Sequence, residues 1–192
     1  FKDLEKGVKR LTSEVIASRP IGIFGDYDVD GATSAAIISK YLEQCGCETF
    51  IHIPDRFLEG YGPNEKALKG LYKKGSKLII TVDCGISSFE PLHVMSSVDI
   101  DVIVIDHHIP DIKLPPAYAI INPKRVDTEK GYEDLCAAGV TFIFLIGLSR
   151  ELRKQGFFKN RAEPNLFQFL DLVALGTVCD VVPLNKLNRA LV

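Results

Sequence analysis

The sequence lacks the features that most directly mark a membrane protein or a non-specific nucleic-acid binder. Its longest apolar stretch, residues 136–148, is shorter than the roughly 20 residues that a membrane-spanning helix needs, and Gly139 and Thr141 interrupt it. It has no basic excess, since 23 Lys and Arg face 25 Asp and Glu and leave a net charge of −2. We therefore expect no membrane association. A local nucleic-acid site stays open, because bound divalent cations raise the potential around them.

Cysteine usage gives no disulfide framework. The five cysteines are an odd number, Cys45 and Cys47 are too close for an easy bridge, and no signal peptide is recognisable. We expect free thiols in a cytoplasmic protein. The chain begins at Phe1 rather than Met and stops at Val192, soon after a predicted helix start. We expect residues 1–192 to be one domain cut from a longer protein that has a further C-terminal domain.

Short apolar runs alternate with segments of helical periodicity along the chain. Such alternation predicts an α/β fold, a doubly wound and mainly parallel β-sheet with helices on both faces. The expected strands are residues 21–25, 49–53, 78–82, 102–105 and 119–121. The expected helices are residues 3–18, one that opens at 31–34 and stops at Gly46, one capped by Asn64, one capped by Ser88, and residues 135–154 and 165–176.

Three acidic clusters follow three of these strands directly. The first contains Asp26, Asp28 and Asp30, the second is DCG at 83–85, and the third is DHH at 106–108. A charge is costly inside a buried strand, so each cluster is expected at a strand's C-terminal end, where open α/β sheets bind ligands. Each cluster alone is typical of an ordinary turn. Together, five carboxylates and two imidazoles at one edge would repel one another unless cations lay among them, so the sequence predicts a divalent-metal site and a hydrolase.

The residue types favour particular ions. Carboxylates suit Mg²⁺ and Mn²⁺, whereas imidazole is common for Mn²⁺, so His107 and His108 favour Mn²⁺ with Mg²⁺ as the alternative. A calcium loop of the EF-hand type is excluded, because its twelfth position would be Ile37 instead of a bidentate Glu. A phosphatase of the haloacid-dehalogenase type, with an aspartyl nucleophile, is a weaker alternative that does not account for the paired histidines.

Two metal ions about 3.5–4 Å apart can share a carboxylate, activate water and clamp the oxygens of a phosphoryl group. Asp83 stands alone after the middle strand, so we expect it to bridge two ions. His52 and His93 lack a comparable context and are expected to be ordinary residues, and Cys84 is expected to serve packing.

The three clusters resemble the motifs of the DHH phosphoesterase family. The first motif corresponds to GDYDVDGATS at 25–34, the second to DCG at 83–85, the third to DHH at 106–108 and the fourth to GTVCDVVP at 176–183. Further similarity lies in residues 53–62, 121–124 and 136–140. The resemblance covers nearly the whole chain with four ordered motifs, and within the family it favours the single-strand-specific 5′→3′ DNA exonucleases.

The resemblance implies roles for individual residues. Asp28 and Asp83 would hold one ion, and the second would be held by Asp30, Asp83, His107 and Asp180. His108 would face the scissile phosphate, and Asp106 would orient an imidazole. Related pyrophosphatases have a metal-binding His where this chain has Phe24, so the first ion would lack a ligand unless Asp26 or water supplied it.

The resemblance also implies a function. It predicts metal-dependent hydrolysis of single-stranded DNA from the 5′ end, with release of mononucleotides, in DNA repair and recombination. Arg56, Lys124 and Arg125 would contact phosphates. The resemblance implies that this chain is the catalytic domain of a longer protein with C-terminal DHH-associated and nucleic-acid-binding domains. That full-length protein would bind single-strand-binding protein and a helicase. The alternatives are another DHH phosphoesterase, acting on short oligonucleotides, cyclic dinucleotides or pyrophosphate, and a non-catalytic binding module with the same fold.

Overall fold

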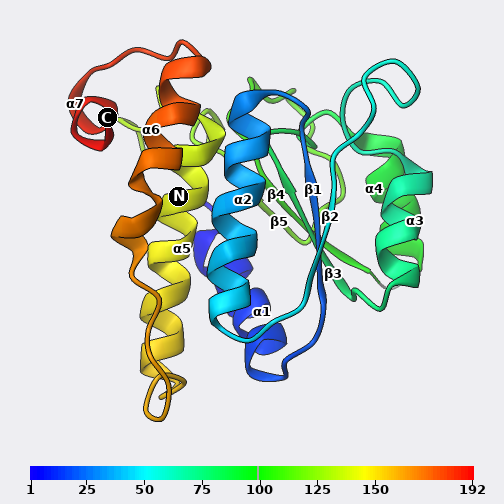
Figure 1. Ribbon diagram of the computed structural model, residues 1–192. Coiled ribbons are helices and arrows are strands. Elements are labelled where there is room, and N and C mark those ends of the chain that lie inside the picture. Colours follow the sequence, from blue (N-terminus) through cyan, green and yellow to red (C-terminus); the bar gives the residue numbers. More distant parts are fainter. Residues whose placement is uncertain (99) are drawn as a thin grey trace.

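A five-stranded parallel β-sheet forms the centre of the protein in a computed structural model that describes residues 1–98 and 100–192 (Figure 1). The strand order is β2-β1-β3-β4-β5. The strands are β1 Ile21–Gly25, β2 Thr49–His52, β3 Leu78–Val82, β4 Asp101–Ile105 and β5 Ala119–Ile121. All four strand pairings are parallel, with Ile21 opposite both Thr49 and Leu78.

Apolar sequence explains the buried strands. Every residue of β1, β3 and β5 is buried, as expected for a parallel sheet covered on both faces. The edge strand β2 is more exposed and more polar. The structure thus confirms the predicted α/β class.

Helices cover both faces of the sheet and make two separate cores (Figure 1). The larger core lies under α1 Leu4–Ile16, α2 Val29–Gln44, α5 Ala137–Lys154 and α6 Leu170–Cys179. The smaller core lies under α3 Glu65–Lys73 and α4 Phe89–Ser97. The remaining helices are the short 3₁₀ helix η1 Leu166–Phe169 and α7 Lys186–Leu191. Within the described residues, no helix is both long and apolar enough to cross a membrane.

Most element boundaries agree with the sequence, and two differences affect the site. Helix α2 begins at Val29 and not at Gly31, so Asp30 lies in its first turn instead of in a loop. The predicted helix at 165–176 is split into η1 and α6 and runs on to Cys179, so Asp180 follows its last turn. Asn64 caps α3 as predicted, with its Oδ1 accepting the Ala67 N–H at 2.8 Å.

The order of the strands determines where a ligand can bind. Strand β1 continues to β2 on one side, and the chain then crosses back to β3 on the other side of β1. In doubly wound sheets of this order, ligands usually bind where the strand order reverses, which here is at the carboxyl ends of β1 and β3. Two of the predicted acidic clusters follow these two strands.

Candidate metal centre

Three adjacent strands bring the predicted clusters together at one edge of the sheet. The site contains three sets of possible metal-ligand atoms. Within each set the atoms lie within 4.8 Å of one another, and some residues belong to two sets. The sets are Asp26, Asp28 and Asp83; Asp30, His107 and Asp180; and Asp83, His107 and His108. Asp83 and His107 belong to two sets each, so they lie at the middle of the site.

His107 is surrounded by carboxylates from other segments of the chain. Its Nε2 lies 3.3 Å from Asp83 Oδ1, 3.6 Å from Asp180 Oδ2 and 3.8 Å from Asp30 Oδ2. Burial and the charge of His108 lower the pKa of His107 to about 4, so the ring is neutral at pH 7 and forms no ion pairs. An ion with six ligands at about 2.1 Å spaces neighbouring donors by about 3 Å and opposite ones by about 4 Å. The donors around His107 have spacings within that range.

Buried polar atoms of the site lack partners, which fits a cation. Both oxygens of Asp83, both ring nitrogens of His107 and Oδ1 of Asp26 are buried without a hydrogen-bond partner among the described residues. An unsatisfied buried donor or acceptor costs about 1–3 kcal/mol, and more when it is charged. Hard carboxylate oxygens and one imidazole nitrogen are the ligands that Mn²⁺ accepts. The residues therefore fit a divalent ion.

Crowding changes the protonation of the carboxylates when no metal is bound. Burial, with the charges of Asp30 and Asp28, raises the pKa of Asp83 to about 11. Burial also raises the pKa of Asp30 to about 6, although two backbone N–H groups oppose this effect. Burial and the charge of Asp28 raise the pKa of Asp180. A divalent cation would reverse these shifts, because it stabilises the ionised forms.

Asp30 is held by the N-terminus of α5. Its Oδ2 accepts the Ala137 N–H at 2.6 Å, and its Oδ1 accepts the Ala138 N–H at 2.8 Å. The unpaired N–H groups of a helix N-terminus suit an anion. Gly176 of α6 packs against the same carboxylate, and a Cβ at Gly176 would lie 2.9 Å from Asp30 Oδ1. Helices α5 and α6 therefore fix Asp30 from two sides.

Asp83 has a strained backbone. Its φ of 62° lies in the left-handed region, which costs a non-glycine residue on the order of 1–3 kcal/mol. Two hydrogen bonds maintain this conformation: its N–H donates to Ile105 O at 2.9 Å, and the Tyr61 hydroxyl donates to its carbonyl oxygen at 3.3 Å. Strain of this kind is common where a side chain must be directed into a functional site.

Asp106 orients His108 and not His107. Its Oδ1 lies 2.8 Å from His108 Nδ1 and accepts the backbone N–H groups of both histidines, while its Oδ2 accepts the Ile86 N–H at 3.0 Å. The bond to Asp106 raises the pKa of His108. Burial alone would raise the pKa of Asp106, but these hydrogen bonds hold it below the usual value. The Nε2 atom of His108 is left to face a ligand, and its side chain is 48% exposed.

Phe24, which stands where related pyrophosphatases have a metal-binding His, serves packing in this structure. Phe24 is fully buried and its ring stacks on His52, with centroids 5.3 Å apart. Asp26 lies with Asp28 and Asp83 instead. Asp28 is partly committed, since its Oδ1 accepts the Gly31 N–H at 2.9 Å and caps α2. The use of Asp26 and Asp28 as metal ligands stays a prediction.

The three predicted phosphate-binding residues have different surroundings. Arg56 lies over the Tyr27 ring, 5.4 Å from its centroid. The charge of Lys124 contributes to the lowered pKa of His107, which places Lys124 near the site.

The prediction for Arg125 needs correction. Its side chain is buried, and its guanidinium donates to Asp3 at 2.8 Å, to both oxygens of Asp127 and to Ile120 O at 2.7 Å. Four of its five N–H donors are thereby used. Arg125 joins the start of α1 to the loop after β5, which is a structural role.

Several site residues were not found from the sequence. These are the N–H donors of Ala137 and Ala138, the Tyr61 hydroxyl, and Asn122, whose Nδ2 donates to His108 O at 2.9 Å. Asn122 directly follows β5 at the same sheet edge as the acidic clusters, so its position in the sequence could have identified it as a site residue. The backbone N–H groups of Ala137 and Ala138 have no comparable sequence signal.

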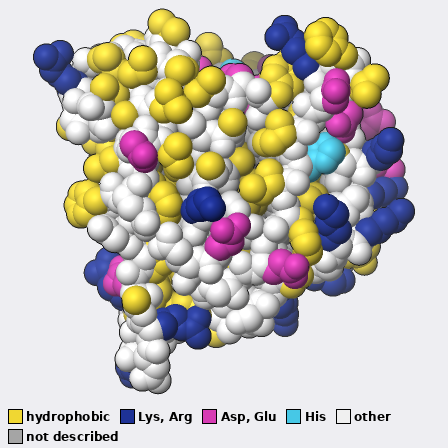
Figure 2. Space-filling model, viewed as in Figure 1, with side chains coloured by type: hydrophobic (Ala, Val, Ile, Leu, Met, Phe, Trp, Pro, Cys, Tyr) yellow, Lys and Arg dark blue, Asp and Glu magenta, His cyan; other side chains and the backbone are white. Residues whose placement is uncertain are grey.

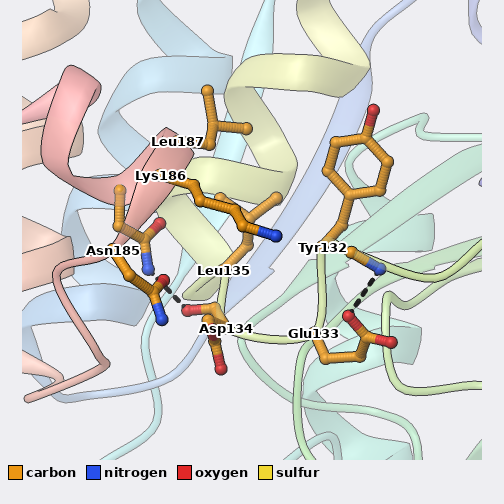
Figure 3. Close-up of a pocket in the computed structure, with 9 residues that line it drawn as sticks. Tyr132, Glu133, Asp134, Leu135, Asn185, Lys186 and Leu187 are labelled. Carbon is orange, nitrogen blue, oxygen red and sulfur yellow. Dashed lines mark hydrogen bonds between the residues drawn. The ribbon is translucent and has the colours of Figure 1, made fainter.

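Two hollows differ in their relation to the site. One of about 280 Å³ is lined by Tyr61, residues 85–88, Asp106 and His108, so it is continuous with the proposed centre. Another of about 140 Å³ lies between residues 131–135 and 185–188 (Figure 3). There the Asn188 side chain donates to Asp134 O at 2.8 Å, and none of the predicted site residues lines it. Of these two hollows, only the first lies beside the predicted site residues.

At the switch point of this doubly wound sheet, carboxylates and histidines lie together in an arrangement that fits divalent metal ions. Residues 20–177 match the model of the DHH family, N-terminal domain. The chain belongs to the DHH family. It is 43% identical over 191 residues to the "Single-stranded-DNA-specific exonuclease RecJ" of Escherichia coli (strain K12), a match that covers 98% of this chain and 33% of that protein. The chain thus spans between 22% and 33% of the length of the curated relatives it matches.

Solved structures agree with this assignment. A structure of exonuclease RecJ bound to manganese matches with a TM-score of 0.85 at 33% identity, over 100% of this chain and 46% of that chain. RecJ from Thermus thermophilus in complex with Mn²⁺ matches with a TM-score of 0.78 at 30% identity, over 100% of this chain and 26% of the other. The Mg²⁺ complex of the Thermus protein matches with a TM-score of 0.62 at 28% identity, over 99% and 22% of the two chains.

Proposed function

We propose that this protein hydrolyses phosphodiester bonds of single-stranded DNA from the 5′ end, using Mn²⁺ or Mg²⁺ and releasing 5′-mononucleotides. The observation that carries this proposal is a group of buried atoms of Asp83 and His107, at the switch point of the sheet, that have no hydrogen-bond partner in residues 1–98 and 100–192. The similarity to RecJ proteins supports the choice of substrate. We also propose that the complete protein acts in the cytoplasm during repair and recombination, together with single-strand-binding protein and a helicase.

The proposed roles follow the geometry. Asp26, Asp28 and Asp83 would hold one ion, and Asp30, Asp83, His107 and Asp180 the other. When bound, the ions supply Lewis acidity toward the phosphate and the attacking water. Side chains of the protein would transfer the proton and bind the neighbouring phosphates.

His108 is the group that would handle a proton at the scissile phosphate. Its Nδ1 is held by Asp106, so its exposed Nε2 can donate to a phosphate oxygen or to the leaving 3′ oxygen. Arg56 and Lys124 would bind the neighbouring phosphates. The hollow of about 280 Å³ beside His108 gives room for a terminal nucleotide.

A substrate panel tests this function. With Mn²⁺, we expect a 3′-labelled single strand to be shortened from its 5′ end, while duplex DNA, cyclic dinucleotides and pyrophosphate are hydrolysed much more slowly. Preference for cyclic dinucleotides or pyrophosphate would assign the site to another DHH reaction. If the protein hydrolysed none of these substrates with Mn²⁺, the result would indicate a non-catalytic binding module.

A further inference from the structure

The loop of residues 54–62, between β2 and α3, keeps two large apolar side chains in solvent. Phe57 is 94% exposed and Leu58 is 87% exposed. In Figures 1 and 2 this loop extends beyond the sheet at the upper right, where hydrophobic side chains lie beside basic and acidic ones. A single exposed apolar residue is ordinary. Two neighbouring exposed apolar side chains, on a loop beside the sheet edge that carries the candidate metal centre, are less common and suggest a binding role.

The loop is held in one conformation by its own hydrogen bonds. Asp55 Oδ1 accepts the N–H groups of Phe57 and Leu58 at 2.8 and 3.0 Å. Glu59 Oε1 accepts the Asp55 N–H at 3.0 Å, and its other oxygen lies 2.9 Å from His52 Nε2. Both apolar side chains are therefore displayed on a preorganised turn, which lowers the entropy cost of binding a ligand there.

The same loop touches the metal centre. The Tyr61 hydroxyl donates to Asp83 O, and the Tyr61 ring lies edge-on to the His108 ring with centroids 6.1 Å apart. Arg56 lies over Tyr27, whose ring is 6.4 Å from that of Tyr61. Aromatic faces and one guanidinium thus lead from the site toward the tip of the loop.

Aromatic rings beside one guanidinium favour a nucleic-acid strand over a protein partner. A specific protein interface buries about 800 Å² on each side. Two side chains offer far less, since even an aromatic side chain buries only about 150–250 Å². Nucleobases that stack on aromatic rings, with phosphates near arginine, need only such a small platform.

We propose that Phe57, supported by Leu58, contacts a nucleobase of the single strand whose phosphate lies at the metal centre. This inference rests on the proposed function and adds a residue that selects long single strands over small phosphodiesters. In this proposal the exposed tip of the loop binds the DNA single strand, and Arg56 contacts one of its phosphates.

The test is a ratio of two activities in the Mn²⁺-loaded protein: kcat/KM for a single-stranded oligothymidylate divided by kcat/KM for bis(p-nitrophenyl) phosphate. Phe57→Ala is expected to lower this ratio roughly tenfold, mainly through KM for the oligonucleotide. Phe57→Trp should restore it. The matched control is Phe167→Ala, which removes a 76% exposed ring from η1 and should leave the ratio unchanged.

A second measurement uses oligonucleotides with 5-iododeoxyuridine near the 5′ end. Irradiation should crosslink the peptide that contains residue 57, and Phe57→Ala should lose that crosslink. An unchanged ratio, an equal loss on both substrates, or a crosslink elsewhere only would overturn the base contact. If the unaltered protein hydrolyses neither substrate, the proposed function fails, and the crosslink alone then decides the contact.

Discussion

Asp83 has three properties that together point to bound cations. Both of its oxygens are buried without partners among the described residues, its φ is 62°, and crowding raises its pKa to about 11. Each property opposes folding of the metal-free protein. A bridging position between two ions would offset the desolvation and explain why the strained backbone directs the carboxylate inward.

We expect Asp83→Asn to lose Mn²⁺ binding and to slow hydrolysis by at least about 10³-fold, because the ions supply several kcal/mol of transition-state stabilisation. The metal-free variant should be as stable as the parent or more stable, since the amide keeps the shape of the carboxyl group and stays neutral without taking up a proton on folding. Calorimetry with Mn²⁺ and thermal unfolding measure both effects. Asp111→Asn, an exposed acid three residues after His108, is the control. Normal activity in Asp83→Asn would remove Asp83 from the bridging position.

The pair of Asp106 and His108 predicts a pH effect. Asp106 raises the pKa of His108, so the protonated ring persists to higher pH than in an isolated imidazole. If His108 donates a proton to the leaving oxygen, kcat falls as pH rises through this raised pKa. Asp106→Asn should move that fall to lower pH, and His108→Gln should remove it and slow turnover while Mn²⁺ binding remains. A pH profile of kcat that is identical in Asp106→Asn would contradict the donor role.

At the scale of elements, the N-terminus of α5 acts on the site through Asp30. Its two N–H donors fix both carboxylate oxygens from more than 100 residues away in the sequence. Outer hydrogen bonds of this kind hold a metal ligand in place and typically change metal affinity 10–100-fold when they are lost.

Ala137→Pro tests this contact selectively. Proline is tolerated at the first position of a helix, but it has no N–H, and its ring would displace the Asp30 carboxylate. We expect Mn²⁺ affinity to fall by roughly 10–100-fold with the helix content retained, as measured by calorimetry and circular dichroism. Glu65→Pro makes the same change at the first position of α3, where it should spare Mn²⁺ binding. Equal effects of the two substitutions would refute a specific role for α5.

At the scale of the whole molecule, the sequence predicts the sheet well because burial on two faces requires continuous apolar strands. The runs at 21–25 and 78–82 agree with β1 and β3 to the residue. The acidic clusters were equally visible, since charge directly after such runs is rare without a reason. Local patterns therefore carry the fold class and most of the candidate site.

Long-range pairings could not be predicted in this way. Arg125 stood on a loop after a strand, as a phosphate-binding residue would, but its partner Asp3 lies 122 positions earlier. The backbone donors to Asp30 depend on the docking of α5 against α2, which a single sequence does not encode as a local signal. Only the assembled tertiary structure reveals which charges are already paired.

The response to Mn²⁺ should depend on pH. The raised pKa values of Asp83, about 11, and Asp30, about 6, mean that the metal-free folded state holds protons that the unfolded chain releases near pH 4. Stability of the metal-free protein therefore falls as pH rises above about 4, while Mn²⁺ binds more tightly as fewer protons compete. Thermal unfolding with and without Mn²⁺ between pH 5 and 8 should give curves that diverge with pH. Parallel curves would contradict this, and Asp83→Asn should reduce the divergence.

The spread of the site along the chain has a consequence for the lifetime of the native state. Its carboxylates run from Asp26 to Asp180 and meet only after β1, β3 and β4 have paired and α5 and α6 have docked. We therefore expect their repulsion to arise late in folding, after most long-range closures are complete. Cations that bind at that stage stabilise the native state more than the folding transition state. They should leave the folding rate almost unchanged and slow unfolding, so that metal ions make the folded domain persist longer.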